Sequence, residues 1–94
     1  MPLTFEWDSR KARSNLTKHS VAFEDATTVF SDPRSLTIPD PEHSLTEPRL
    51  ITMGMALGNK LLVVVHTERG DNIRIISARR ANSRERKFYE EEVS

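Results

Sequence analysis

Residues 49–80 read RLITMGMALGNKLLVVVHTERGDNIRIISARR, and this stretch decides the fold class. Large apolar residues recur at every second position from Ile51 to Leu57, and the run after it is apolar on both sides. The first pattern is typical of a half-buried strand and the second of a central strand. Gly58-Asn59 and Gly70-Asp71 are turn signals between the runs. We therefore predict a three-stranded antiparallel meander over Arg49–Leu57, Leu61–Thr67 and Ile73–Ala78.

The turns also predict which residues face each other across the strands. With two-residue turns, Ile51 faces His66, and on the next pair Thr67 faces Arg74 while Leu62 faces Arg79. This register places Arg79 on an apolar face that packs on helices and Arg74 on the opposite, open face. A slip of one residue exchanges the two faces.

The residues before the meander predict one strand and two helices. Thr4–Trp7 has the pattern of a short edge strand, and Asp8 is a suitable cap for a helix over Ser9–His19 that ends at Ser20. Apolar residues then recur at helical spacing from Phe23 to Phe30, and Asp32-Pro33 ends that segment.

The remaining segments complete an α+β domain over residues 1–94. We predict a strand over Ser35–Ile38, an exposed loop that contains His43 and Glu47, and a last helix to about Glu92. Asn82 and Glu85 form a capping box for that helix, and Phe88 or Tyr89 anchors it on the sheet. The expected order is β-α-α-β-β-β-β-α, with two N-terminal helices and one C-terminal helix against an antiparallel sheet.

Composition limits the classes of function. The chain has no cysteine, so it has neither a disulfide framework nor a thiolate metal site. No signal sequence or membrane span is apparent, and we expect a cytoplasmic protein without a membrane partner. The net charge is zero, but residues 21–48 carry a net −5 and residues 69–87 a net +5. A local basic surface of this kind attracts phosphate in a neutral chain, although charge runs are also common on solvated helix faces.

Three segments in order resemble the BrnT toxins. They are FEWDSRKARSNLTKHSVAFEDATTVF from Phe5, the spacing of Asp40, His43-Ser44, Glu47 and Arg49, and GDNIRIISARRANSRERKFYE from Gly70. The resemblance implies a RelE-like fold and a ribonuclease toxin of a type II toxin–antitoxin system that arrests growth. The family usually has Gly where Ser20 stands, which suits a left-handed helix end.

RNA is cleaved without a metal when its own 2′-OH attacks the adjacent phosphate. Such a site needs a base, an acid, and cations for the charge on phosphorus. We assign these catalytic roles to Glu47, Arg49, Arg74, Arg79 and His43. We assign RNA contacts to Lys18, His19 and Arg80. No cofactor or metal is expected, because the acidic and histidine residues lack a regular ligand spacing.

Alternatives remain for single residues and for the whole chain. In one alternative, Glu47 and Arg49 form only a surface ion pair. In another, His66 is a structural histidine of the sheet and not a base. The resemblance implies a BrnA-like ribbon-helix-helix antitoxin, a heterotetramer with it, and operator DNA contact only through the antitoxin. The competing hypothesis is a non-catalytic module that binds RNA or a protein. A repressor that acts on DNA alone is disfavoured by the zero net charge.

Overall fold

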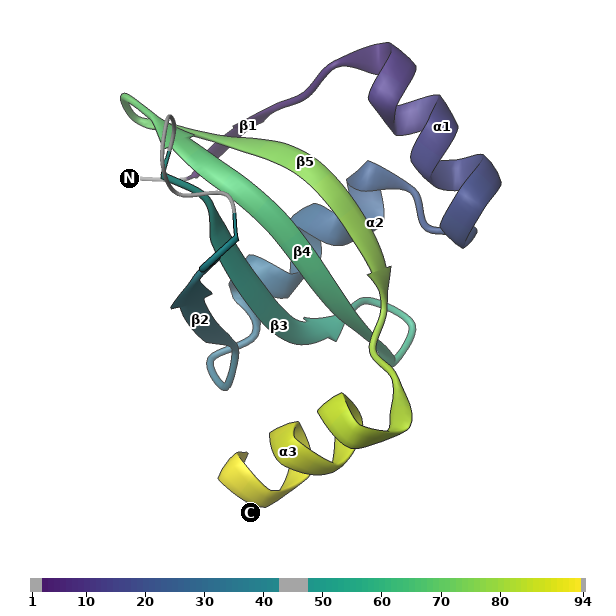
Figure 1. The fold of residues 1–94 in the computed structure, drawn as a ribbon, viewed down its shortest axis with the longest axis vertical. Coiled ribbons are helices and arrows are strands. Elements are labelled where there is room, and N and C mark those ends of the chain that lie inside the picture. Colours follow the sequence, from purple (N-terminus) through teal and green to yellow (C-terminus); the bar gives the residue numbers. More distant parts are fainter. Residues whose placement is uncertain (1–2, 43–47, 94) are drawn as a thin grey trace.

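A computed structural model describes residues 3–42 and 48–93 (Figure 1). The element order is the predicted one, with a short 3-10 helix after the second α-helix. The elements are β1 (Thr4–Glu6), α1 (Ser9–His19), α2 (Phe23–Thr27), η1 (Thr28–Ser31), β2 (Leu36–Pro39), β3 (Leu50–Ala56), β4 (Lys60–Arg69), β5 (Asn72–Arg80) and α3 (Ser83–Val93). The α+β class is confirmed. The structure has no helix long and apolar enough to span a membrane in the residues it describes.

The five strands form one sheet in the order β1-β5-β4-β3-β2. The apolar strand β4 is central, as predicted, and β2 through β5 pair antiparallel. The sheet is mixed and not wholly antiparallel, because β1 pairs parallel with β5. A strand as short as β1 does not show from its sequence whether it pairs parallel or antiparallel. Here the path of the chain through α1 and α2 sets the direction of β1.

The predicted register between β3 and β4 is wrong by one residue. Ala56 pairs with Lys60, so the loop between them holds three residues and not two. Gly58 and Asn59 both have positive φ, at +82° and +60°. Leu50, and not Ile51, therefore faces His66. Every side chain of β3 lies on the face opposite to the one that the sequence predicted.

A β-bulge changes the register between β4 and β5. Thr67 faces Arg74 as predicted, but the register shifts at Val65/His66, and Val63 rather than Leu62 faces Arg79. A bulge inserts one residue into one strand, which reverses the alternation beyond it. As a result Arg74 and Arg79 lie on the same face of the sheet, and the prediction that they lie on opposite faces is wrong.

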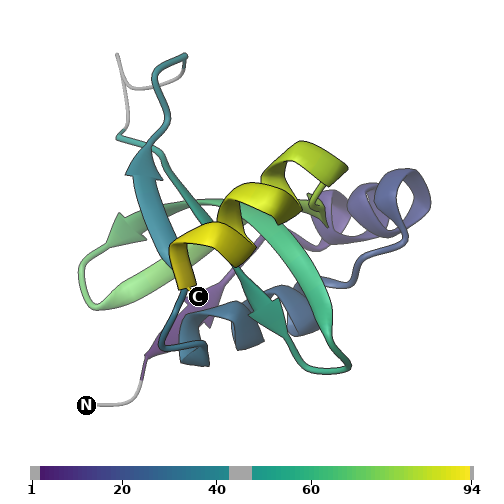
Figure 2. The same ribbon diagram turned by 90° about the horizontal axis from the view of Figure 1, so that it is seen from below.

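The core lies between the sheet and the layer formed by α1, α2 and η1 (Figure 2). Phe23 and Val29 are fully buried there against strand residues such as Leu62 and Val64. Gly54 allows η1 to approach β3, because a Cβ at this position would lie only 3.1 Å from the Val29 carbonyl oxygen.

The caps of α1 follow the predicted pattern. Asp8 accepts hydrogen bonds from the backbone N–H of Arg10 and Lys11, at 2.8 and 3.1 Å. Ser20 ends the helix in the left-handed region, with φ +57°. Asn15 on the inner side is buried and bonds to the backbone of β5. These contacts place α1 along the outer edge of β5.

The helix α3 lies at the end of the sheet, away from α1 (Figure 1). Its capping box is confirmed, with Asn82 and Glu85 exchanging two side chain-to-backbone hydrogen bonds. Tyr89 is the anchor, since it is buried and donates a hydrogen bond to Asp32. Phe88 is 52% exposed.

Candidate functional site

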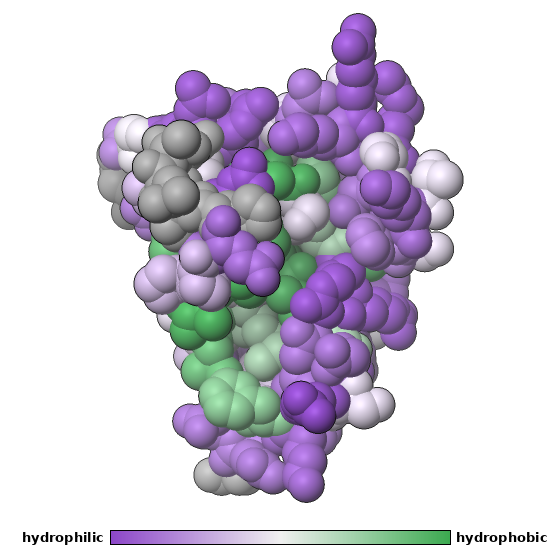
Figure 3. Space-filling model, viewed as in Figure 1, coloured by the Kyte–Doolittle hydropathy of each residue, from purple (hydrophilic) through white to green (hydrophobic). Residues whose placement is uncertain are grey.

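One face of the sheet, the open face, is free of α1 and α2. Cross-strand pairs place its side chains together, because paired residues point to the same side. It includes Leu36, Ile38, Ile51, Met53, Val63, Val65, Thr67, Arg74, Ser77 and Arg79. The β2 and β3 end is apolar, and the β5 end carries arginine and hydroxyl groups. Figure 3 shows the apolar part as a band bordered by hydrophilic side chains.

Arg79 is held in a fixed position at this face. Both terminal nitrogens of its guanidinium donate to the Glu85 carboxylate at 2.8 Å. The Arg79 hydrogen bond lowers the pKa of Glu85, and the same bond raises the pKa of Arg79. The Arg79 side chain is nevertheless 43% exposed. A bidentate pair of this kind orients the cation and leaves part of it accessible.

Arg74 lies further along the same face with a weaker carboxylate contact. Its terminal nitrogen is 3.4 Å from an oxygen of Glu6, the residue beside it on β1. Thr67 faces Arg74 across the strands and is buried, and its hydroxyl has no hydrogen-bond partner among the described residues. The Thr67 hydroxyl can therefore still form a hydrogen bond to a ligand beside Arg74.

Arg49 lies two residues before Ile51, and strand alternation therefore places it on the side of the open face. It is half-buried, and it forms no ion pair with residues 3–42 or 48–93. His43 and Glu47 lie outside the described residues. Their assignment as catalytic groups, and the pairing of Glu47 with Arg49, stay predictions.

The predicted RNA contacts lie at the flank of the open face. Lys18 and His19 are exposed at the end of α1, and they line a hollow between α1 and β5. Arg80 is exposed at the last position of β5. The structure thus places Arg49, Arg74 and Arg79 on one face of the sheet. Lys18, His19 and Arg80 lie beside or beyond its β5 edge.

His66 is a structural residue of the core side. Its Nε2 and the Thr52 hydroxyl are 2.7 Å apart, and the ring contacts Phe30 edge to face. Burial lowers the pKa of His66 to about 4, so the ring is neutral at neutral pH. The interpretation of His66 as a sheet histidine agrees with this position, which faces away from the open face.

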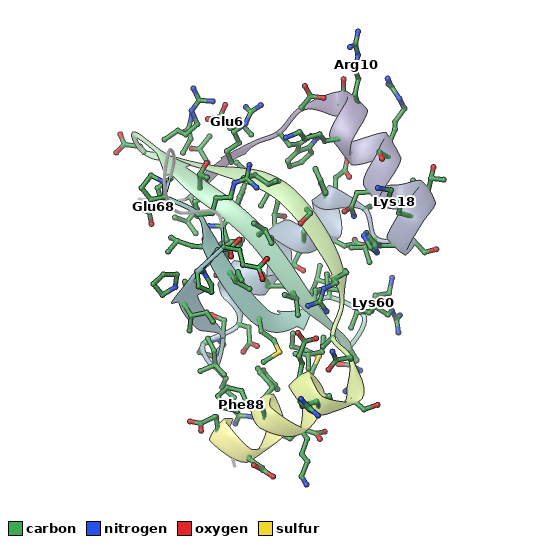
Figure 4. All side chains as sticks on the ribbon, in the orientation of Figure 1. Glu6, Arg10, Lys18, Lys60, Glu68 and Phe88 are labelled. Carbon is green, nitrogen blue, oxygen red and sulfur yellow. The ribbon has the colours of Figure 1, made fainter. Side chains whose placement is uncertain are left out.

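Sequence reasoning missed an apolar groove between the open face and α3. The groove has a volume of about 340 Å³ and is lined by Leu36, Ile38, Ile51, Met53, Val63, Arg84, Glu85 and Phe88. Figure 4 shows Phe88 on the side of α3 that faces the sheet. The alternation from Ile51 was visible in the sequence, but the register error assigned those side chains to the core.

One comparison with known proteins identifies the family, and a second finds a solved structure with a similar fold. The family model described as ribonuclease toxin, BrnT, of type II toxin-antitoxin system matches residues 7–85. The crystal structure of the Brucella abortus ribonuclease toxin BrnT is similar in fold, with a TM-score of 0.68 and 24% identity, over 87% of this chain and 100% of that chain. No curated protein matches the sequence. Because the family match covers most of the chain, this protein belongs to the BrnT family of ribonuclease toxins from type II toxin–antitoxin systems.

Proposed function

We propose that this protein is an endoribonuclease that cleaves RNA without a metal ion, on the open face of the sheet. The observation that carries the proposal is the common face of Arg74 and Arg79, which the β-bulge creates. Arg49 extends the same face by strand alternation. Guanidinium groups bind phosphate oxygens in pairs and stay charged at every physiological pH, so they suit the charge that develops on phosphorus.

In the proposed reaction the 2′-oxygen forms a bond to phosphorus and the bond from phosphorus to the 5′-oxygen breaks. A base takes the proton of the 2′-OH and an acid protonates the 5′-oxygen. We assign these proton transfers to Glu47 and His43, and phosphate binding to Arg49, Arg74 and Arg79. Lys18, His19 and Arg80 contact the neighbouring backbone of the RNA.

The carboxylates on the arginines are compatible with this role. Glu85 bonds both terminal nitrogens of Arg79, and the exposed 43% of that side chain is the part available to a phosphate. Glu6 holds Arg74 at the longer distance of 3.4 Å, so a phosphate with two oxygens can replace it. Preorganised cations of this kind stabilise a developing charge without a large rearrangement.

The family also implies an antitoxin as partner. We propose a BrnA-like ribbon-helix-helix protein that covers the open face, forms a heterotetramer with the toxin and contacts operator DNA by itself. Free toxin arrests growth in this scheme, and the bound toxin is inactive. Co-expression with a BrnA-like antitoxin tests this part, because we expect the antitoxin to restore growth.

Incubation of the purified protein with RNA in excess chelator tests the enzymatic proposal. We expect cleavage with a cyclic phosphate at the 2′,3′ end, and a loss of at least 100-fold in rate for Arg79→Ala, roughly the effect of removing one transition-state contact. Arg86→Ala, an exposed arginine on α3, is the matched control. A urea unfolding curve shows whether Arg79→Ala is folded. RNA that is bound but left intact by the wild type refutes cleavage and supports the binding module.

A further inference from the structure

A second cationic surface lies beside the open face, between α1 and the outer edge of β5. It is a hollow of about 180 Å³ whose lining includes Lys11, Ser14, Lys18, His19, Ile76 and Ser77. The described residues that line it include no carboxylate. This distinguishes the hollow from the sites of Arg74 and Arg79, where an acidic side chain already contacts each cation.

Helix geometry explains why these cations share one side of α1. Lys11, Ser14 and Lys18 are spaced by three and four residues, which places them in one row along the helix. Lys11 and Lys18 are seven residues apart, or about 10 Å along the axis. Arg10 and Arg13 do not line the hollow, since Arg13 lies on the opposite side of α1 and Figure 4 shows Arg10 pointing away from the molecule.

The walls of the hollow are fixed by hydrogen bonds. The Asn15 side chain donates to the carbonyls of Val21 and Ala78, at 2.9 and 2.8 Å, and accepts from the N–H of Ala78 at 3.0 Å. These bonds hold α1 against the edge of β5. Ile76, which the bulge leaves without a cross-strand partner, and Ser77 line the other wall.

We infer that this hollow binds the sugar-phosphate backbone of the RNA strand outside the cleaved bond, with Lys11 and Lys18 on separate phosphates. The inference rests on the proposed function, because it names how the same substrate continues past the site. Lysine ammonium groups bind phosphate as point charges, and hydroxyls of Ser14 and Ser77 are additional donors. Ser77 belongs to the open face as well, two residues from Arg79 along β5, so the path is continuous.

The test is binding of a single-stranded 2′-O-methyl RNA, which lacks the attacking hydroxyl, by fluorescence anisotropy over a range of salt concentrations. For Lys11→Gln/Lys18→Gln we expect the slope of log Kd against log salt to fall by about 1.4, since each phosphate contact on a single strand contributes about 0.7. The same relation gives a loss of about 25-fold in affinity at 0.1 M salt. Arg10→Gln/Arg13→Gln removes the same charge from the same helix, and we expect its slope to match the wild type.

The outcomes separate this inference from the proposed function. An equal change for both double variants, no change for either, or no RNA binding by the wild type overturns the inference. A cleavage assay of the wild-type protein on a dinucleotide, which reaches only the open face, reports on the proposed function alone. Absence of cleavage alongside the expected difference in slope refutes the enzyme and leaves the backbone site in place.

Discussion

Asn15→Ala is expected to destabilise the protein strongly. The variant leaves three buried backbone groups without their partner, which are the N–H and carbonyl of Ala78 and the carbonyl of Val21. An unsatisfied buried group costs about 1–3 kcal/mol, so the low end gives a loss of about 3 kcal/mol in the free energy of unfolding. A 94-residue protein has about 5–14 kcal/mol in total.

Urea unfolding followed by circular dichroism measures this loss. With a slope of about 1.5 kcal/mol/M, the midpoint falls by about 2 M. The matched control is Leu16→Ala, since Leu16 is the next residue of α1 and is 52% exposed. Its expected loss is below about 1 kcal/mol. If Asn15→Ala and Leu16→Ala unfold at the same midpoint, the three hydrogen bonds do not hold α1 on the sheet and the reasoning is wrong.

Three further predictions concern Ser20, Tyr89 and His66. Ser20→Gly removes a side chain at φ +57° and is expected to stabilise the protein by about 1 kcal/mol, seen as a rise in Tm; an unchanged Tm contradicts it. Tyr89→Phe removes a hydrogen bond to the Asp32 carboxylate. The opening free energy that amide exchange measures in α3 is therefore expected to fall by about 1.5 kcal/mol, while exchange in α1 stays constant. Burial lowers the pKa of His66 to about 4, and the unfolded chain therefore binds more protons than the native one between about pH 6.5 and pH 4. Stability present above pH 6.5 is lost as the pH falls through this window, by up to about 3 kcal/mol, and His66→Gln is expected to lack that part of the slope; equal slopes for the two proteins refute it.

The parts of the fold that sequence analysis predicted are those with local causes. Asp8 and the Asn82–Glu85 pair cap helices through hydrogen bonds that span three residues or fewer. The apolar run in β4 predicted a central strand, because both of its faces are covered. These features depend on neighbours along the chain, so a single sequence shows them.

The register of the strands has a different origin, and the candidate site depends on it. The loop at Gly58 holds three residues and the bulge near Ile76 adds one to β5. A period-two pattern contains no signal for either, because it shows where apolar residues alternate and not how long a loop is or where an extra residue is inserted. The sequence identified Arg74 and Arg79 as candidates, but only the bulge places them on one face. The apolar groove was missed for the same reason, because the predicted register assigned Ile51 and Met53 to the core.

The arrangement of the strand edges has a consequence for solubility. An unpaired edge invites a strand of another molecule, and many proteins prevent this with charge repulsion. This chain has no net charge at pH 7, so it lacks that protection. Instead, β1 covers the edge of β5 over residues 72–74, and the Asn15 amide forms the hydrogen bonds that a neighbouring strand would form at Ala78. The opposite edge of the sheet is the four-residue strand β2, which contains Pro39. Both edges of the sheet are therefore short, which disfavours the addition of a strand from another molecule.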